Sequence, residues 1–238
     1  MDGGLFSMMK LKKSLLILDV ITILLVASAA GLVFFYAPLE AVMGYVQKVF
    51  YFHVSSAWVG MLSFIVAAVA GGVYLKNGQR KWDITSYAAV EIGVLFAIIA
   101  IITGSIWARP IWNTWWTWDP RLTTTAIMTL VYVAYLMLRQ GIDDPEKRAR
   151  FGAVYVIIGA LSVPLTFMSI RIFRTIHPVV INAPNGTSAA FDMAPKMLLT
   201  FLFSLFAFSV LFVTLLWHRV ELGKAQDELE QKKLLSND

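Results

Sequence analysis

The 238-residue sequence contains no cysteine, and only 15% of its residues are charged. Without cysteine the chain can form no disulfide, no thiolate metal site and no thioether bond to a c-type haem. A soluble domain of this size needs about 25% charged residues, so the low charge, together with 58% hydrophobic residues, excludes a soluble enzyme. The P-loop, the Rossmann glycine pattern and H-E-x-x-H are also missing. Any ATP-driven step must therefore belong to a partner.

Long hydrophobic runs dominate the rest of the sequence. A transmembrane helix requires about 20 mainly apolar residues. Six segments meet this requirement, at about 14–36, 52–75, 84–107, 122–138, 151–170 and 197–218. We therefore predict an all-α polytopic membrane protein with six transmembrane helices, in a single domain over residues 1–238. The first run contains Ala27-Ser28-Ala29, which is typical of a signal-peptidase site. The run exceeds the roughly 7–15 apolar residues of a signal peptide, so an uncleaved helix is favoured.

Lysine and arginine are unevenly distributed between the spans. Fourteen of the 20 lie before the first span, near residues 76–81, near 139–150 and in the tail 219–238, and six lie in the other three loops. Since cytoplasmic loops carry the excess of Lys and Arg, we predict that both termini are cytoplasmic. The loops 37–51, 108–121 and 171–196 then face outward. The tail 219–238 is predicted to continue the sixth helix into the cytoplasm.

Five of the eight tryptophans fall between positions 107 and 118, in a predicted outward loop at 107–123. Tryptophans at a membrane surface can form an aromatic belt, but a belt distributes them over the ends of many helices. Five in one loop favour a platform that stacks against a large flat ligand. Asp119 and Arg121 in this loop could pair with each other, or Arg121 or Arg109 could bind ligand carboxylates.

Two of the three histidines are predicted on the same side of the membrane as this loop. His53 lies at the outward end of the second span, and His177 lies in the last outward loop. If the fifth helix continues that far, Arg171, Arg174 and His177 share one face, and Pro178 ends the helix. Each histidine alone is more typical of an interfacial hydrogen-bonding residue than of a ligand. Together with the tryptophans and arginines, they supply what haem requires: axial nitrogens, an aromatic surface and cations for two propionates.

Two acidic residues within the spans favour a different function. Asp19 and Glu91 are intramembrane carboxylates, which are costly and by default indicate a functional site. The alternative prediction is therefore a transporter that moves haem or another solute across the bilayer. Both acids lie near the predicted cytoplasmic ends of their spans, where pairing between helices explains them equally well. His218, also at that side, is predicted to be an interfacial anchor. A structural subunit that only anchors partners is a third possibility.

The run WNTWWTWDPRLT at residues 112–123 resembles the tryptophan-rich WWD signature, W-G-x-W-W-x-W-D-x-R-L-T, of haem-handling proteins of cytochrome c biogenesis. Asn113 stands where glycine is usual, and Ala108 follows Trp107 where glycine is expected. These departures bear on the loop backbone, because glycine permits a positive φ. Six spans, this chain length and one histidine on either side of the motif are similar to the CcmC family of system I cytochrome c maturation.

The resemblance implies a periplasm-facing site for non-covalent haem b in a bacterial inner membrane, with His53 and His177 as axial ligands. The residues that would hold the haem are Trp112, Trp115, Trp116, Trp118 and Asp119. The candidate partners of the propionates are Arg109, Arg121, Arg171 and Arg174. The resemblance also implies haem delivery to the chaperone CcmE, cooperation with CcmD and with the ABC-type subunits CcmA and CcmB, and no enzymatic turnover by the chain itself.

Overall fold

The computed structural model describes residues 2–41, 43–178 and 193–237, and their side chains over 13–41, 43–178 and 193–233. These residues form helices and no strand. The elements are α1 (Asp2–Gly31), its π-helical end η1 (Leu32–Tyr36), α2 (Gln47–Asn77), α3 (Arg80–Trp112), α4 (Pro120–Gln140), α5 (Pro145–Gly159), α6 (Ser162–Ile172) and α7 (Pro195–Asn237). Within the predicted outward loop 171–196, positions 179–192 lie outside the described residues.

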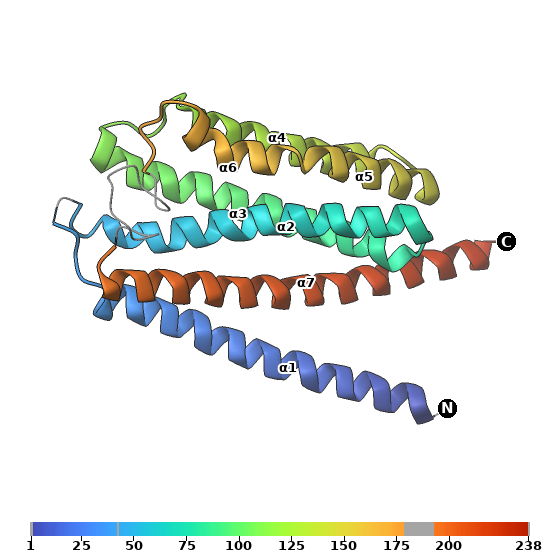
Figure 1. Ribbon diagram of the computed structural model, residues 1–238. Coiled ribbons are helices and arrows are strands. Elements are labelled where there is room, and N and C mark those ends of the chain that lie inside the picture. Colours follow the sequence, from blue (N-terminus) through green and yellow to red (C-terminus); the bar gives the residue numbers. More distant parts are fainter. Residues whose placement is uncertain (1, 42, 179–192, 238) are drawn as a thin grey trace.

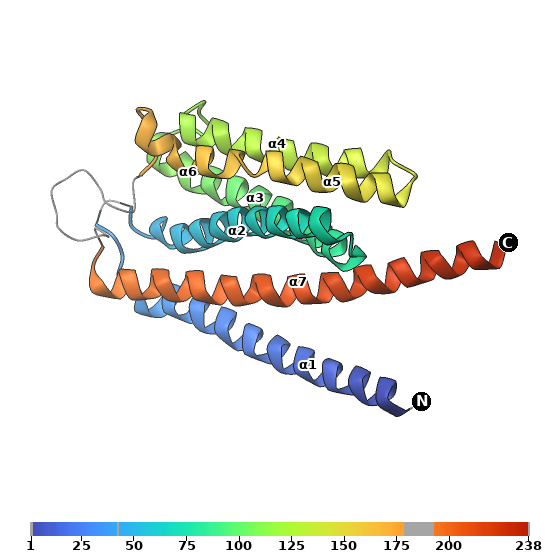
Figure 2. The same cartoon turned by 45° about the vertical axis from the view of Figure 1, so that its right-hand side comes forward.

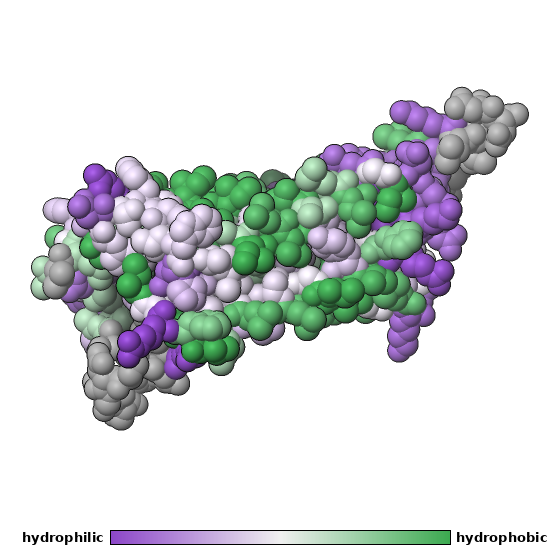
Figure 3. Space-filling view, turned by 90° about the horizontal axis from the view of Figure 1, so that it is seen from above, coloured by the Kyte–Doolittle hydropathy of each residue, from purple (hydrophilic) through white to green (hydrophobic). Residues whose placement is uncertain are grey.

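Six helical segments are long and apolar enough to cross a membrane. They are Lys13–Tyr36, Gln47–Asn77, Arg80–Trp112, Pro120–Gln140, Pro145–Ile172 and Pro195–Lys233. Figure 3 shows hydrophobic residues along the length of the bundle and hydrophilic residues gathered towards its ends. The protein is therefore a multi-pass membrane protein, and the predicted all-α, six-span fold class is confirmed. The helices extend beyond the predicted spans because the hydropathy pattern reports the hydrocarbon-spanning part of a helix and not its polar ends.

The long helices run side by side along one axis, and both ends of the chain lie at the same end of the bundle (Figure 1). α2 packs extensively against α3. α4, α5 and α6 form a layer on one side of this pair, and α7 lies on the other side. α1 packs mainly against α7 at the edge of the bundle, as Figure 2 also shows. At the end away from the termini lie the connection 113–119 and the segment that follows α6. This arrangement brings residues distant in sequence together at that end.

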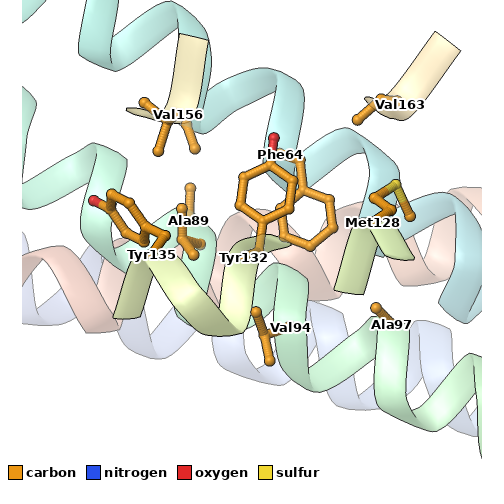
Figure 4. Close-up of a cluster of buried hydrophobic side chains, with 11 residues drawn as sticks. Phe64, Ala89, Val94, Ala97, Met128, Tyr132, Tyr135, Val156 and Val163 are labelled. Carbon is orange, nitrogen blue, oxygen red and sulfur yellow. The ribbon is translucent and has the colours of Figure 1, made fainter. Parts of the chain in front are cut away.

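The central core joins α2, α3, α4 and the α5–α6 pair (Figure 4). Phe64 of α2 and Tyr132 of α4 stack face to face, with ring centroids 3.6 Å apart and an interplanar angle of 1°. Gly93 of α3 provides the space for this pair, since a Cβ there would lie 2.5 Å from Cε1 of Phe64. Ala97 and Met128 belong to this core and also line the cavity described below. The packed core therefore forms the floor of that cavity.

The fifth span is broken into two helices by a turn at residues 160–161. Pro164 has no N–H to donate to the carbonyl of Ala160, and its ring crowds that carbonyl. The break between α5 and α6 therefore falls in the turn just before Pro164. The condition under which Arg171, Arg174 and His177 would share a helical face is not met, because α6 ends at Ile172 and the next residue has extended backbone angles. Arg171 alone of the predicted face lies on the helix, and Arg174 and His177 follow it.

The Gly71-Gly72 pair on α2 offers a direct test of helix packing. A Cβ on Gly71 would lie 2.8 Å from Cγ2 of Val156 and 3.2 Å from the carbonyl oxygen of Ala153, whereas a Cβ on Gly72 would meet nothing within 4 Å. We expect Gly71→Ala to destabilise the protein by about 1–3 kcal/mol through overpacking. Gly72→Ala should be neutral or stabilising by up to about 1 kcal/mol, since alanine favours helix. Thermal unfolding in detergent measures both, and equal midpoints would contradict the packing of α2 on α5.

Candidate functional site

A cavity lies between α2, α3, α4 and α6, at the end of the bundle away from the chain termini. The space within it, including the part open to solvent, is about 1250 Å³, and its walls are mainly apolar. His53 of α2 and His177 of the segment after α6 both line it. The two histidines are 124 positions apart in the sequence, and the fold brings them to one cavity.

The orientation of His53 is set by α3. Its Nδ1 lies 2.9 Å from the carbonyl oxygen of Ala100, and the hydroxyl of Thr103 lies 3.4 Å from the same nitrogen. A carbonyl can only accept, so Nδ1 carries the proton and donates, which leaves Nε2 with a free lone pair. Gly104 makes room for this ring, because a Cβ there would lie 2.9 Å from its Cε1. The neighbouring helix therefore fixes both the position and the tautomer of His53.

His177 has a matching arrangement. Its Nδ1 lies 3.1 Å from the carbonyl oxygen of Pro178, so this nitrogen donates and Nε2 keeps its lone pair. Burial, and then the positive charge of Arg121, lower the pKa of His177 to about 4. The imidazole is therefore neutral at neutral pH, which is the form that binds metals. The ring centroids of His53 and His177 are 6.4 Å apart.

The five clustered tryptophans do not all face the cavity. Trp107 and Trp112 lie in the last turns of α3, edge to face with centroids 5.1 Å apart, and Trp116 lies in the connection 113–119. These three line the cavity. Trp115 and Trp118 do not line it, and their residues are 58% and 79% exposed. The predicted loop 107–123 is thus mostly helical at both ends, and its tryptophans form an inner group and an outer pair.

Asn113, which stands where glycine is usual in the motif, ends α3 in the left-handed conformation. Its φ is 56°, a region that favours glycine and that asparagine tolerates better than other side chains. The guanidinium of Arg109 donates to the carbonyl and side-chain oxygens of Asn113, both at 2.7 Å. Arg109 therefore stabilises this turn, and it does not line the cavity. Ala108 is buried within the helix, where an alanine side chain is accommodated.

Asp119 caps α4 and also contacts the segment that carries His177. Its Oδ1 accepts from the backbone N–H of Arg121 at 3.0 Å and from the hydroxyl of Thr175 at 2.7 Å. Its Oδ2 accepts from the backbone N–H of Ile176 at 2.9 Å. Both oxygens of this buried carboxylate are therefore occupied by the protein. Asp119 itself does not line the cavity, and the contact that it makes with Arg121 is through the backbone.

Two of the four candidate arginines line the cavity. Arg121 of α4 donates to the carbonyl oxygen of Thr166 and lies beside the ring of Phe167, with its guanidinium carbon 6.0 Å from the ring centroid. Arg171 of α6 also lines the cavity, whereas Arg109 and Arg174 do not. The positive charge at the cavity therefore comes from the α4 and α6 side, opposite α2 and His53.

The intramembrane acids lie far from this site. Asp19 of α1 lies 2.7 Å from Nε2 of His218, and Glu91 of α3 lies 2.7 Å from Nε of Arg219, both on α7. Neither acid lines the cavity. Glu91 is 13 residues before Gly104 on the same helix, which corresponds to roughly 20 Å along its axis. The geometry favours the interhelical pairing that the sequence left open, and His218 anchors α7 to α1.

Comparison with known proteins identifies the family. The family model described as CcmC, Heme exporter protein C, matches residues 5–235. This chain belongs to the CcmC family. It is 34% identical over 180 residues to Heme exporter protein C of Bradyrhizobium diazoefficiens, covering 75% of this chain and 67% of that protein. It is 30% identical over 182 residues to Heme exporter protein C of Escherichia coli K12, covering 76% and 72%. A ccmC-like mitochondrial protein of cytochrome c biosynthesis from Marchantia polymorpha is 28% identical over 189 residues, covering 79% and 80%.

Membership in the CcmC family gives this membrane protein a role in haem handling for cytochrome c maturation. Some cavity residues of this CcmC-family chain were not among the site residues predicted from the sequence. They are Gly104, Met128 and Phe167. A signal for Gly104 was available: Ala97, Ala100, Gly104 and Trp107 follow one another at helical spacing, so a helix that continues to residue 112 places all four on one face. Met128 and Phe167 resemble ordinary core residues, and only packing assigns them to the cavity.

Proposed function

We propose that this protein binds haem b non-covalently in the cavity, with His53 and His177 as axial ligands, and presents it to the haem chaperone CcmE during cytochrome c maturation. The observation that carries the proposal is the distance of 6.4 Å between the two ring centroids. Imidazole nitrogens bind metal ions at about 2.0 Å. Since each nitrogen lies about 1.1 Å from the centre of its ring, two imidazoles on opposite sides of one iron place their ring centres roughly 6 Å apart.

The hydrogen bonds of both histidines support the same assignment. Ligating histidines almost always donate their second ring N–H to a carbonyl or carboxylate, which fixes the tautomer and raises the basicity of the ligand. Nδ1 of His53 and Nδ1 of His177 each contact a backbone carbonyl, of Ala100 and Pro178 respectively. The free nitrogen is therefore Nε2 on both rings.

The donor set suits haem better than a bare metal ion. Among the residues that the structure describes, no group of three or more His, Asp or Glu side chains could hold a metal ion. A zinc or copper ion takes at least three protein ligands. Haem brings four nitrogens of its own and requires only axial ligands from the protein. Two imidazoles in an apolar cavity meet that requirement.

The walls of the cavity match the other parts of the haem molecule. Trp107, Trp112 and Trp116 provide flat apolar surface, and Trp112 lies 6.5 Å from the ring of His177. Arg121 and Arg171 provide two cations, which we assign to the two propionates. The indole N–H of Trp107 is buried, with no hydrogen-bond partner among the described residues. We assign it a carboxylate oxygen of the ligand, since buried donors are otherwise costly.

We assign the remaining motif residues to the loop itself and to the partner. Trp115 and Trp118 lie outside the cavity on the exposed side of the connection 113–119. A pair of exposed tryptophans beside the cavity suits contact with CcmE, because indole rings are enriched in protein interfaces. Arg109 supports the turn at Asn113, and Arg174, which is exposed, is left as a peripheral cation. The chain thus acts by binding and presenting haem, and we assign no enzymatic turnover to it.

We place the protein in a bacterial inner membrane, with the haem site facing the periplasm and both termini in the cytoplasm. The excess of Lys and Arg at the end of the bundle that holds the termini supports this orientation. We treat residues 1–238 as one haem-handling domain. ATP-binding motifs are missing from the sequence, so the ATP-dependent step would belong to CcmA and CcmB, with CcmD as the small membrane subunit.

Purification of the protein in mild detergent tests this proposal. We expect a Soret band, a pyridine haemochrome spectrum of haem b, and release of the pigment into acidified acetone, because no cysteine is present to hold it covalently. If folded, monodisperse protein carries no haem after purification and causes no change in the Soret band when haemin is added, haem binding is refuted.

The transporter alternative makes a different prediction. If Asp19 and Glu91 carry a substrate path, neutralising them abolishes solute movement in proteoliposomes, while changes to the cavity tryptophans have little effect. The pairing of both acids with residues of α7 favours a structural role instead.

Gly104 provides a sharp test of the position of His53. We expect Gly104→Ala to lower haem affinity by about tenfold or more, as for other changes that displace a ligand's surroundings. The reason is that the new Cβ would lie 2.9 Å from Cε1 of His53. Haemin titration followed at the Soret band measures the affinity. Gly72→Ala, on open space in α2, is the matched control and should bind haem like the parent. Equal affinities for Gly104→Ala and the parent would contradict this position of the imidazole.

A further inference from the structure

Asp119 is placed to hold the segment that carries His177. Asp119 is 9% exposed, and its two carboxylate oxygens accept three hydrogen bonds from two separate parts of the chain. One donor is the backbone N–H of Arg121 in α4. The other two, the hydroxyl of Thr175 and the backbone N–H of Ile176, immediately precede His177. A single carboxylate therefore joins the start of α4 to the segment after α6.

The contact continues to His177 itself. The backbone N–H of His177 donates to the hydroxyl oxygen of Thr175 at 3.0 Å, and that hydroxyl donates to Asp119. Residues 173–178 are neither helix nor strand, so no regular backbone pattern fixes their position. The charge-assisted bonds from Thr175 and Ile176 to Asp119 connect this segment to the start of α4.

Capping of α4 alone does not require these extra contacts. The chain contains a second Asp-Pro helix start, at Asp144-Pro145, where Oδ1 of Asp144 accepts from the backbone N–H groups of Glu146 and Lys147. That is an ordinary N-cap with proline at the first helical position. Asp119 caps α4 in the same way and in addition binds Thr175 and Ile176. A comparison of the two aspartates therefore separates helix capping, which both perform, from the contact with residues 175 and 176, which Asp119 alone of the two makes.

We infer that Asp119 is a positioning residue, which acts on the ligand through His177 and does not itself touch haem. This inference rests on the proposed haem site. Asp119 does not line the cavity, and its carboxylate is occupied by protein donors. The aspartate of the WWD motif thus has a different task from the tryptophans beside it. Its removal would leave the pocket intact but release the segment that supplies one ligand.

Asp119→Asn is the decisive variant, because asparagine caps helices as well as aspartate. With its amide oxygen in the capping position of Oδ1, its amide nitrogen replaces Oδ2 and cannot accept from the backbone N–H of Ile176. In haem-free protein, we expect amide hydrogen exchange over residues 173–178 to accelerate by about tenfold or more. In haem-loaded protein, we expect the spectrum to lose its six-coordinate form, and added imidazole to restore it. Thr175→Val should give a smaller change of the same kind. Asp144→Asn is the matched control and should behave like the parent in both measurements.

Amide hydrogen exchange in Asp119→Asn at the rate of the parent would overturn the inference. Loss of haem that imidazole does not restore would also overturn it, because the effect of the variant would then indicate direct contact between Asp119 and haem. If Asp119→Asn does not fold, Thr175→Val decides by the same two measurements. Failure of the proposed function looks different: the parent would then bind no haem, while hydrogen exchange in haem-free protein would still report whether Asp119 holds residues 173–178.

Discussion

Replacement of His177 by glycine is expected to lower the haem content of the purified protein by about tenfold or more, since loss of even an outer-shell partner costs a metal site about 10–100-fold. His53→Gly should have the same effect. The haem that remains should be five-coordinate, because one axial nitrogen is gone. Imidazole in the buffer should restore the six-coordinate spectrum by occupying the space left by the side chain. The pyridine haemochrome content per protein and the Soret spectrum measure both effects.

His218→Gly is the matched control for this experiment. It is the third histidine of the chain, pairs with Asp19 and does not line the cavity. We expect this variant to keep the haem content and spectrum of the parent. If all three variants behave alike, or if neither cavity histidine alters the spectrum, the axial assignment is wrong. If only one of the two cavity variants alters the spectrum, haem is held by a single histidine, and the distance between the two rings does not reflect ligation of one iron by both.

Removal of the carboxylate of Asp83 should produce the largest loss of stability. Asp83 is 2% exposed, and its two oxygens bind the guanidinium groups of Arg139 of α4 and Arg80 of α3. Arg139 is also buried, and Arg80 continues to Asp227 on the tail of α7. Removing one partner leaves a buried charge uncompensated, so we expect Asp83→Ala to cost about 3–5 kcal/mol. Denaturant or thermal unfolding in detergent measures the difference.

Two controls separate charge from volume in this test. The exposed pair Lys147–Asp144, with 3.9 Å between its charged atoms, contributes little, so Lys147→Ala should change stability by less than about 1 kcal/mol. The double variant Asp83→Leu with Arg139→Met removes both buried charges and should recover most of the lost stability. A double variant as unstable as Asp83→Ala would show that packing around the pair, and not an unpaired charge, dominates.

The transmembrane architecture could be predicted because it depends on a local property. A run of about 20 apolar residues is sufficient to cross the hydrocarbon layer, whatever the rest of the chain does. The ends of the helices were less accessible. α3 begins at Arg80 and continues through Pro110 to Trp112, because a helix satisfies most of its backbone hydrogen bonds internally and can continue beyond the hydrocarbon layer. Hydropathy alone therefore ended this span at residue 107 and placed Trp112 in a loop, whereas Trp112 is the last residue of the helix.

The composition of the site could also be predicted, but its internal arrangement could not. The tryptophan-rich run and the two flanking histidines indicated haem from residue type and predicted sidedness. Which of these residues face the cavity depends on how α2, α3, α4 and α6 pack, and no local pattern distinguishes Trp116 from Trp118 or Arg121 from Arg174. Nor does a local pattern show that α6 ends at Ile172, before it reaches His177, or that the segment after it is hydrogen-bonded to Asp119 from a distant part of the chain.

The sequence by itself determined the six spans, the all-α class and the set of residue types able to hold haem, because hydrophobic length and side-chain chemistry are carried by neighbouring residues. The tertiary structure decided that His53 and His177 lie 6.4 Å apart, that only some of the tryptophans and arginines line the cavity, and that Asp119 binds the segment of His177. These are distances between residues far apart in the chain, and only the packing of helices against one another sets them.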